Sequence, residues 1–238
     1  MKLSDFRELG ATARLSEVKR VLVVTGWKGG IGKSTVACSL AMALAKTGAE
    51  TGLLDADITG ACCHSILGVK PTFPQEIEGL EPRPVAGVKF MSAAFFSGGG
   101  AVALRGGDVS RSLLELLAVT QWRELDFLVI DMPPGISDAG LELLRLVPRA
   151  ELVIVSVPGK LAQGALRRSL KLFGEFGAPV AGIVANAVVP GHRPAEKNLL
   201  GAIPHDPRYE AAIGNPAVIA KTRVFKAALD IAGALRRN

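Results

Sequence analysis

The stretch Trp27-Lys28-Gly29-Gly30-Ile31-Gly32-Lys33-Ser34-Thr35 decides the fold of this 238-residue chain. The run of residues 21–25 before it is apolar and rich in β-branched side chains, which is typical of a buried strand. Residues 34–46 after it carry apolar side chains at helical spacing. The stretch therefore lies where a strand turns into a helix, which is the setting that a phosphate-binding loop requires.

The chemistry of this loop follows from its residue types. The backbone of Gly29, Gly30, Ile31 and Gly32 can turn tightly and aim successive N–H groups at a polyphosphate, and the dipole of the following helix adds positive charge. Lys33 supplies a mobile cation for the β and γ phosphates. A glycine-rich turn with incidental lysines is the plainer alternative, and the flanking strand and helix argue against it.

Two hydroxyl side chains complete the loop. Ser34 is placed to ligate Mg²⁺, and Thr35 lies one residue further into the helix, near the α phosphate. The loop therefore predicts binding of a nucleoside triphosphate together with Mg²⁺.

The segment 28–35 resembles the deviant Walker A motif of the MinD, ParA and Mrp group of ATPases. Residues 53–60 resemble the first switch segment of that group, and residues 125–138 resemble the Asp-x-Pro-Pro-Gly-x-x-Asp signature of its Mrp branch. The likeness continues through Arg105-Gly106, Trp122, residues 182–184, Asn186 and residues 200–204. The resemblance implies that Lys28 reaches across a homodimer to the nucleotide of the partner.

The expected fold is α/β, with a doubly wound, mostly parallel central sheet flanked by helices, as in MinD- and ParA-like P-loop NTPases. Helical patterns separate most of the apolar runs, which favours βαβ crossovers. Since no Pro- or Ser-rich linker divides the chain, we expect residues 1–238 to form a single P-loop ATPase domain. Strand-like runs begin near Val21, Gly52, Val88, Phe127, Leu152, Val180 and Leu199.

Three further residues are expected around the γ phosphate. Asp131 ends the apolar run 127–130, so its carboxylate emerges beside the phosphate loop and can hold a water of the Mg²⁺ shell. Pro133-Pro134 stiffen the backbone, which lets the Gly135 N–H point at a γ phosphate. The resemblance implies that Asp57 orients the attacking water and that Asp55 is more structural, so Lys28, Lys33 and Asp57 form the expected catalytic set.

The base-binding residues are less sharply indicated. Asn186 follows an apolar strand, and a carboxamide can pair with N6 and N7 of adenine. An asparagine that merely closes a strand is an equally good interpretation from spacing alone, and the resemblance tips the balance toward ATP. Pro204, in the segment 203–207, is expected against the other side of the base, and a plain strand-to-helix turn explains that segment nearly as well.

The cysteines depart from the Mrp pattern. Most Mrp-type proteins carry a Cys-x-x-Cys pair that binds a bridging iron-sulfur cluster, and the corresponding residues 187–198 contain no cysteine. The usual cluster ligands are therefore excluded, and whether an iron-sulfur cluster is a cofactor is left open. Cys62, Cys63 and His64 could face a second subunit across one metal, but adjacent side chains diverge and core cysteines are common. Cys38 is expected in the core.

Trp27 stands where the family usually has glycine. Either Gly26 supplies the missing flexibility or the loop enters the phosphate site along a different path, and a distorted loop predicts slow turnover or low nucleotide affinity.

The likeness implies an ATP hydrolase that dimerises with ATP and assists assembly of an iron-sulfur or other metal cofactor, with a client metalloprotein or cluster scaffold as partner. The alternative is an ATP-driven positioning switch on membrane or DNA. Residues 224–237 form an amphipathic, basic stretch that could serve it, together with Lys160, Arg167, Arg168 and Lys171, but packing within the domain explains both features better. Membrane and nucleic-acid partners are therefore disfavoured, and a small-molecule kinase is the weakest interpretation.

Charges occupy the first eight residues where a signal peptide needs an apolar stretch, and three cysteines fit a reducing compartment, so a cytoplasmic protein is expected. The net charge of +6 is modest and favours no particular partner. The glycine clusters around residues 97–107 are expected in a surface loop rather than in a flap over the site.

Overall fold

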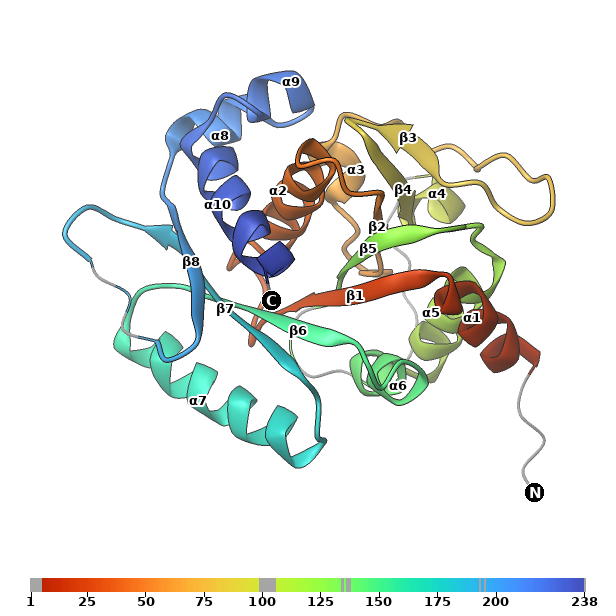
Figure 1. The fold of residues 1–238 in the computed structure, drawn as a ribbon, viewed down its shortest axis with the longest axis horizontal. Coiled ribbons are helices and arrows are strands. Elements are labelled where there is room, and N and C mark those ends of the chain that lie inside the picture. The colour runs from red at the N-terminus through yellow and green to blue at the C-terminus, as the bar shows by residue number, and fades with distance from the viewer. Residues whose placement is uncertain are drawn as a thin grey trace.

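The computed structural model describes residues 6–98, 106–133, 135, 138–192, 194 and 196–237. Within these residues the chain forms an eight-stranded sheet of order β3-β4-β2-β5-β1-β6-β7-β8 (Figure 1). Every neighbouring pair is parallel except β3 and β4. The strands are β1 (Val18–Thr25), β2 (Thr51–Asp55), β3 (Arg83–Val85), β4 (Val88–Ser92), β5 (Leu125–Asp131), β6 (Glu151–Ser156), β7 (Val180–Val188) and β8 (Leu199–Pro204).

Helices cover both faces of the sheet (Figure 1). α2 and α10 pack against each other on one face, and α1, α5 and α6 pack together on the other, where α7 also lies. The expected doubly wound architecture is confirmed. The helices are α1 (Phe6–Ser16), α2 (Lys33–Lys46), α3 (Cys63–Ile66), α4 (Ala94–Ser97), α5 (Gly106–Val119), α6 (Asp138–Leu146), α7 (Lys160–Glu175), α8 (Pro207–Ala212), α9 (Pro216–Ile219) and α10 (Arg223–Arg237).

The central strands are buried on both faces, which explains why their sequences read as continuous apolar runs rather than alternating ones. In β5 the side chains of residues 127–131 are all buried, and in β1 those of residues 21–25. Trp122, just before β5, is fully buried. This rigid centre fixes the carboxyl ends of β1, β2 and β5, where the polar residues singled out by the sequence lie.

All seven predicted strands are present. The prediction missed β3, a three-residue strand that pairs antiparallel with β4 at the edge of the sheet and has Pro84 at its centre. A proline donates no ladder hydrogen bond and is tolerated at a sheet edge, so this strand has no apolar signature of its own. The helix predicted over 34–46 begins one residue earlier, at Lys33. The segment 99–105, which includes Arg105, lies outside the described residues.

The C-terminal helix packs on its own domain. Val224, Ala228, Ile231 and Leu235 of α10 are buried, and the helix lies against α2 and β8. Its apolar stripe is therefore already covered and does not face a membrane surface. No helix within the described residues combines the length and apolar composition needed to cross a lipid bilayer.

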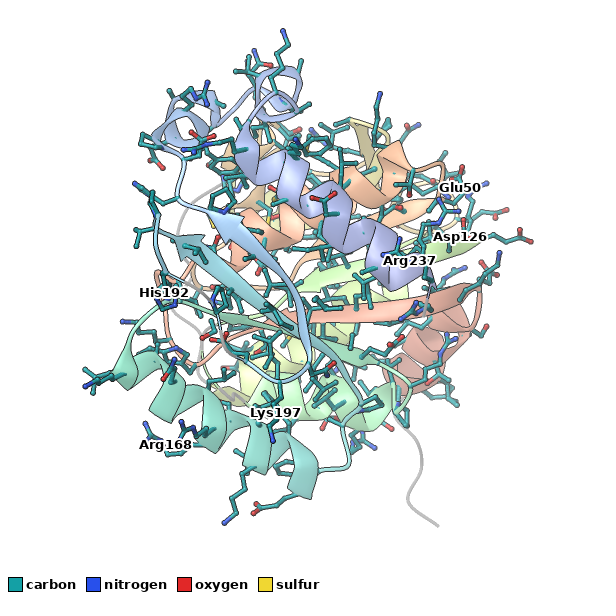
Figure 2. All side chains as sticks on the ribbon, turned by 60° about the vertical axis from the view of Figure 1, so that its left-hand side comes forward. Glu50, Asp126, Arg168, His192, Lys197 and Arg237 are labelled. Atoms are coloured by element: carbon teal, nitrogen blue, oxygen red, sulfur yellow. The ribbon has the colours of Figure 1, made fainter. Side chains whose placement is uncertain are left out.

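The basic residues proposed for a DNA-binding face lie apart. Figure 2 shows Arg168 on α7 and Arg237 at the end of α10, on opposite sides of the sheet. Arg237 instead lies in the region of Glu50 and Asp126 (Figure 2). These arginines therefore do not form the single basic face considered from the sequence, because α7 and α10 cover different faces of the sheet.

Candidate nucleotide-binding site

The loop between β1 and α2 depends on glycine at two positions. Gly30 and Gly32 adopt left-handed backbone conformations with φ of 77° and 85°, which side chains disfavour. At Gly32 a Cβ atom would also lie 2.2 Å from Asn186 Nδ2. Gly29 and Gly30 are exposed, and a Cβ at either would meet no atom within 4 Å. Their backbone thus borders open space that a polyphosphate can enter.

The first turn of α2 carries the charged and hydroxyl groups. Lys33 is buried, while Ser34 and Thr35 are half-buried. The Ser34 hydroxyl hydrogen-bonds the Asp131 carboxylate, and the Lys33 charge lowers the pKa of that carboxyl. Thr35 hydrogen-bonds Tyr209. The two residues predicted to hold Mg²⁺, Ser34 and Asp131, therefore lie in direct contact.

Two buried carboxylates meet at the ends of neighbouring strands. Asp55 ends β2 and Asp131 ends β5, and the two residues are partners in the strand register. Asp55 Oδ2 accepts hydrogen bonds from the Cys63 N–H at 3.0 Å and the Ser92 hydroxyl at 3.1 Å. The Cys63 thiol in turn donates to Asp131 Oδ2, with 3.3 Å between the sulfur and the oxygen.

Burial has a large electrostatic effect on this pair. Burial, together with the nearby charge of Asp131, raises the pKa of Asp55 to about 8. Burial also raises the pKa of Asp131 to about 6, against the lowering by hydrogen bonds from Ser34 and Cys63 and by the charge of Lys33. Asp55 Oδ1 and Asp131 Oδ1 are buried without a hydrogen-bond partner. The carboxylate of Asp131 and the hydroxyl of Ser34 are hard oxygen donors of the kind that Mg²⁺ prefers, so these two residues fit the predicted metal.

Asn186 supports the loop directly. It is buried within β7, two residues before that strand ends. Its Nδ2 donates a hydrogen bond to the Ile31 carbonyl oxygen at 2.9 Å. The described contact thus fixes the shape of the phosphate loop. The pairing of Asn186 with adenine stays a prediction.

The Gly135 N–H already has an acceptor. It donates to the Gly26 carbonyl oxygen at 2.9 Å, and its φ of 82° needs glycine. Contact of this N–H with a γ phosphate stays a prediction and requires the N–H to leave Gly26. Pro134 and residues 136–137 of the signature lie outside the described residues.

Lys28 and Trp27 lie together at the mouth of the loop. The exposed Lys28 ammonium lies 4.6 Å from the centroid of the Trp27 ring, in a cation–π contact. Positive φ angles in this loop occur at Gly30 and Gly32 and not at Trp27. The backbone at position 27 therefore does not require glycine, and the tryptophan is accommodated without left-handed strain.

Asp57 caps the turn that follows β2. Its Oδ1 accepts hydrogen bonds from the Thr59 hydroxyl and the Gly60 N–H, both at 3.0 Å. Its charge raises the pKa of both Asp55 and Asp131, which shows that it lies close to the buried pair. Orientation of a water by Asp57 stays a prediction.

The cysteines separate as the alternation of side chains predicts. Cys62 is exposed, whereas Cys63 is buried against the two carboxylates, and Cys38 is buried in the core of α2. His64 Nε2 lies 3.1 Å from the Ser65 hydroxyl. Sequence reasoning missed the contacts of Cys63 and Ser92 with the acidic pair, because neither residue belongs to a recognisable motif.

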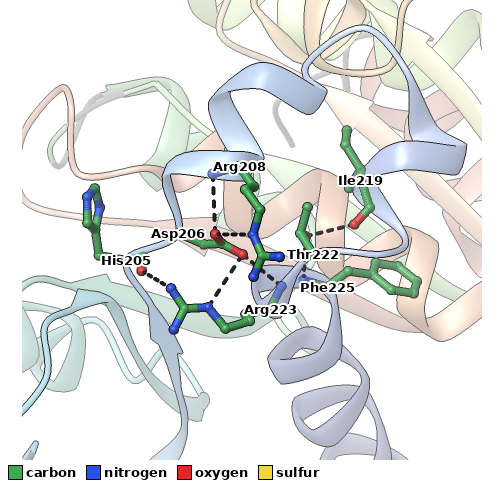
Figure 3. A network of polar contacts seen from close by, with 7 residues as sticks. All are labelled: His205, Asp206, Arg208, Ile219, Thr222, Arg223 and Phe225. Atoms are coloured by element: carbon green, nitrogen blue, oxygen red, sulfur yellow. Dashed lines mark hydrogen bonds and ion pairs between the residues drawn. The ribbon is translucent and has the colours of Figure 1, made fainter.

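The turn after β8 is held by the buried carboxylate of Asp206 (Figure 3). It accepts the N–H groups of Arg208 at 3.2 Å and Arg223 at 3.0 Å, and it pairs with both guanidinium groups. Asp206 therefore joins the start of α8 to the start of α10. The segment that contains Pro204 is thus a strand-to-helix turn, and contact of Pro204 with a base stays a prediction.

Comparison with known proteins identifies the family. Residues 17–202 match the ParA family model, described as NUBPL iron-transfer P-loop NTPase. The iron-sulfur cluster carrier protein of Pseudomonas fragi is 41% identical over 179 residues, which are 74% of this chain and 62% of that protein. The chloroplastic Fe-S cluster assembly factor HCF101 of Arabidopsis thaliana is 38% identical over 175 residues, 72% of this chain and 33% of that protein. The chain thus spans less than two thirds of the length of these curated relatives.

Solved structures agree on the fold. A nucleotide-binding protein from Archaeoglobus fulgidus in complex with ADP superposes with a TM-score of 0.74 at 28% identity, over 90% of this chain and 93% of that one. The cell division ATPase MinD of Pyrococcus furiosus superposes with a TM-score of 0.71 at 23% identity, over 92% of this chain and 99% of that one. Because this family model covers most of the chain and the phosphate loop has the required glycine geometry, this chain belongs to the ParA family of P-loop NTPases.

Proposed function

We propose that this chain is a Mg²⁺-dependent ATPase that forms an ATP-bridged homodimer and assists the assembly or transfer of an iron-sulfur or other metal cofactor. The observation that carries the proposal is the contact between Ser34 and Asp131 beside the buried Lys33, at the end of a loop with an open backbone face. Family membership supports ATP binding and points to an iron-transfer role.

The proposed chemistry depends mainly on positioning and charge, as phosphoryl transfer generally does. The loop backbone and Lys33 bind the β and γ phosphates, and Ser34 and Asp131 hold Mg²⁺, the latter through water. When bound, Mg²⁺ neutralises phosphate charge. Asp57 orients the attacking water. The Gly135 N–H exchanges its acceptor, so that it donates a hydrogen bond to the γ phosphate instead of to the Gly26 carbonyl oxygen.

Lys28 is the proposed link between two subunits. Its ammonium group is exposed at the mouth of the loop and lies over the Trp27 ring. A cation in this position is free to meet the phosphates of a nucleotide that a second copy presents. Trp27 offers the same partner a half-buried aromatic surface.

The cluster is proposed as cargo rather than as a resident cofactor. Residues 187–198 contain no cysteine, so the thiolates that hold a cluster are proposed to come from a client metalloprotein or a scaffold. The names of the relatives, a cluster carrier protein and a cluster assembly factor, support this direction.

Nucleotide binding is tested by isothermal titration calorimetry with a non-hydrolysable ATP analogue and Mg²⁺. We expect saturable binding in the wild type, loss of at least tenfold in affinity in Lys33→Ala through the lost charge-assisted contacts, and no change in Lys46→Ala at the exposed end of α2. Absence of binding by the wild type would contradict the proposal at its base.

The cargo role is tested by visible absorption under anaerobic conditions. A cluster-loaded scaffold protein is mixed with an apo-ferredoxin, with and without this chain and ATP. We expect the chain to accelerate transfer in an ATP-dependent manner. Equal transfer rates in all mixtures would restrict the function to nucleotide binding and hydrolysis.

A further inference from the structure

Asp55, Cys63 and Asp131 form a carboxylate–thiol cluster beneath the phosphate loop. We propose that this cluster is a binding site for a divalent transition-metal ion such as Zn²⁺ or Fe²⁺, with the Cys63 sulfur and one oxygen from each aspartate as ligands. This donor set differs from the oxygen ligands of the Mg²⁺ site, and its occupancy requires no nucleotide.

The geometry of the cluster is close to that of a metal site. One ligand atom from each of the three residues lies within 4.8 Å of the others, and all three residues are buried. Bonds of about 2.1 Å to oxygen and 2.3 Å to sulfur place neighbouring tetrahedral ligands roughly 3.4 to 3.6 Å apart. The separation of 3.3 Å between Cys63 Sγ and Asp131 Oδ2 already agrees with this spacing. The ligand oxygen of Asp55 lies within 4.8 Å of the other two atoms, so an inward movement of at most roughly 1.4 Å completes the set.

Two buried oxygens lack a partner. Asp55 and Asp131 are 0% and 1% exposed, and their Oδ1 atoms accept no hydrogen bond. A buried carboxylate oxygen without a partner is costly, and proteins satisfy such atoms with donors or cations. The arrangement of the other contacts keeps the cluster in place, because the Cys63 N–H and the Ser92 hydroxyl both hold Asp55 Oδ2.

Sulfur selects the class of metal. Mg²⁺ takes oxygen ligands in near-ideal octahedral geometry, whereas thiolates favour Zn²⁺, Fe²⁺ and similar ions. The Cys38 thiol also hydrogen-bonds Cys63, so a second sulfur lies beside the first. On binding, a metal–sulfur bond replaces the Cys63 S–H bond, and the thiol proton leaves to solvent.

Asp131 belongs to both donor sets, because it also contacts Ser34. Occupancy of the carboxylate–thiol cluster and binding of Mg²⁺ with ATP are therefore expected to compete. In the nucleotide-free protein, Mg²⁺ with ATP does not compete for Asp131. Metal binding by the cluster can therefore be tested even if the proposed ATPase activity fails.

The test is a titration of the nucleotide-free protein with Co²⁺ under anaerobic conditions, followed by absorption spectroscopy. We expect one equivalent of Co²⁺ to produce a sulfur-to-cobalt charge-transfer band in the near ultraviolet and visible bands of a four-coordinate ion. Cys63→Ser should lose the charge-transfer band. It should also bind Co²⁺ at least about tenfold more weakly, because loss of a group that only supports a ligand already costs that much. The matched control Cys62→Ser, which removes the exposed neighbouring thiol, should retain the band.

A second variant protects the test against misfolding of Cys63→Ser. In the double variant Cys38→Ala and Cys62→Ser, Cys63 is the single thiol of the chain, so a retained charge-transfer band assigns the sulfur ligand directly. Loss of the band in this double variant, loss of the band in Cys62→Ser, or absence of any band in the wild type would each overturn the proposal.

Discussion

Replacing Asp55 with asparagine is expected to flatten the pH dependence of stability in the metal-free protein. Burial and the nearby Asp131 raise the pKa of Asp55 from 3.8 to about 8. Between these values the folded state holds a proton that the unfolded state has released, so the free energy of unfolding falls as the pH rises. The contribution is fully present below about pH 4 and is lost as the pH passes through about 8.

The magnitude follows from one proton. Each pH unit inside this interval changes the free energy of unfolding by about 1.4 kcal/mol, so Asp55 contributes a loss of about 3 kcal/mol between pH 5.5 and 7.5. Asparagine does not titrate, and its amide oxygen can still accept from the Cys63 N–H and the Ser92 hydroxyl. The wild type should therefore lose about 3 kcal/mol more than Asp55→Asn over this range.

Urea denaturation in EDTA at pH 5.5, 6.5 and 7.5, followed by circular dichroism, measures this difference. The matched control is Asp126→Asn. Asp126 accepts from Lys19 Nζ at 2.7 Å, and this bond lowers its pKa, so it stays ionised throughout the range. Its replacement should leave the pH slope unchanged. Parallel pH profiles for the wild type and Asp55→Asn would refute the reasoning that the raised pKa of a buried carboxyl makes stability fall as the pH rises.

Three further substitutions test the loop and its surroundings. Lys28→Ala should abolish ATP-dependent dimerisation in size-exclusion chromatography while Lys46→Ala does not, and an unchanged dimer would exclude a trans-acting lysine. Asn186→Ala should weaken ATP binding by roughly 5- to 15-fold in calorimetry, because about 1 to 1.5 kcal/mol of hydrogen bonding to the Ile31 carbonyl is lost; an unchanged affinity would contradict its supporting role. Asp206→Ala should destabilise the fold by about 1 to 2 kcal/mol and lower the melting temperature by roughly 2 to 8 °C in calorimetric scans, because α8 loses the side chain that caps its first turn. A smaller change than about 2 °C would show that the turn does not depend on it.

Much of the fold is predictable because a doubly wound sheet gives strong signals. Strands buried on both faces read as apolar runs, so β1 and β5 could be located within three residues of their starts. The edge strand β3 could not, since its three residues include a proline and are not fully buried. The burial of the C-terminal helix against α2 was the better of two interpretations, and the packing confirms it.

The site was predictable where a motif fixes backbone geometry and less so where tertiary contacts decide. The contact of Ser34 with Asp131 follows from the parallel pairing of β1 and β5, which brings the phosphate loop and Asp131 to the same edge of the sheet. The position of Cys63 does not follow, because its direction depends on the short helix α3 turning the thiol toward the sheet. The existing partners of Asn186 and Gly135 could not be read from the sequence either, since a side-chain amide or a backbone N–H can serve several acceptors.

The Gly135 N–H already donates a hydrogen bond to the carbonyl of Gly26, the residue after β1, so a phosphate has to compete with that carbonyl for the same donor. One N–H satisfies one strong acceptor at a time, so an anion that recruits this donor has to displace a carbonyl of comparable strength. The exchange trades one hydrogen bond for another, and its net free energy is only on the order of 1 to 2 kcal/mol. If the Gly135 N–H binds the last phosphate as proposed, a small difference in free energy is therefore enough to shift this donor between the Gly26 carbonyl and the nucleotide.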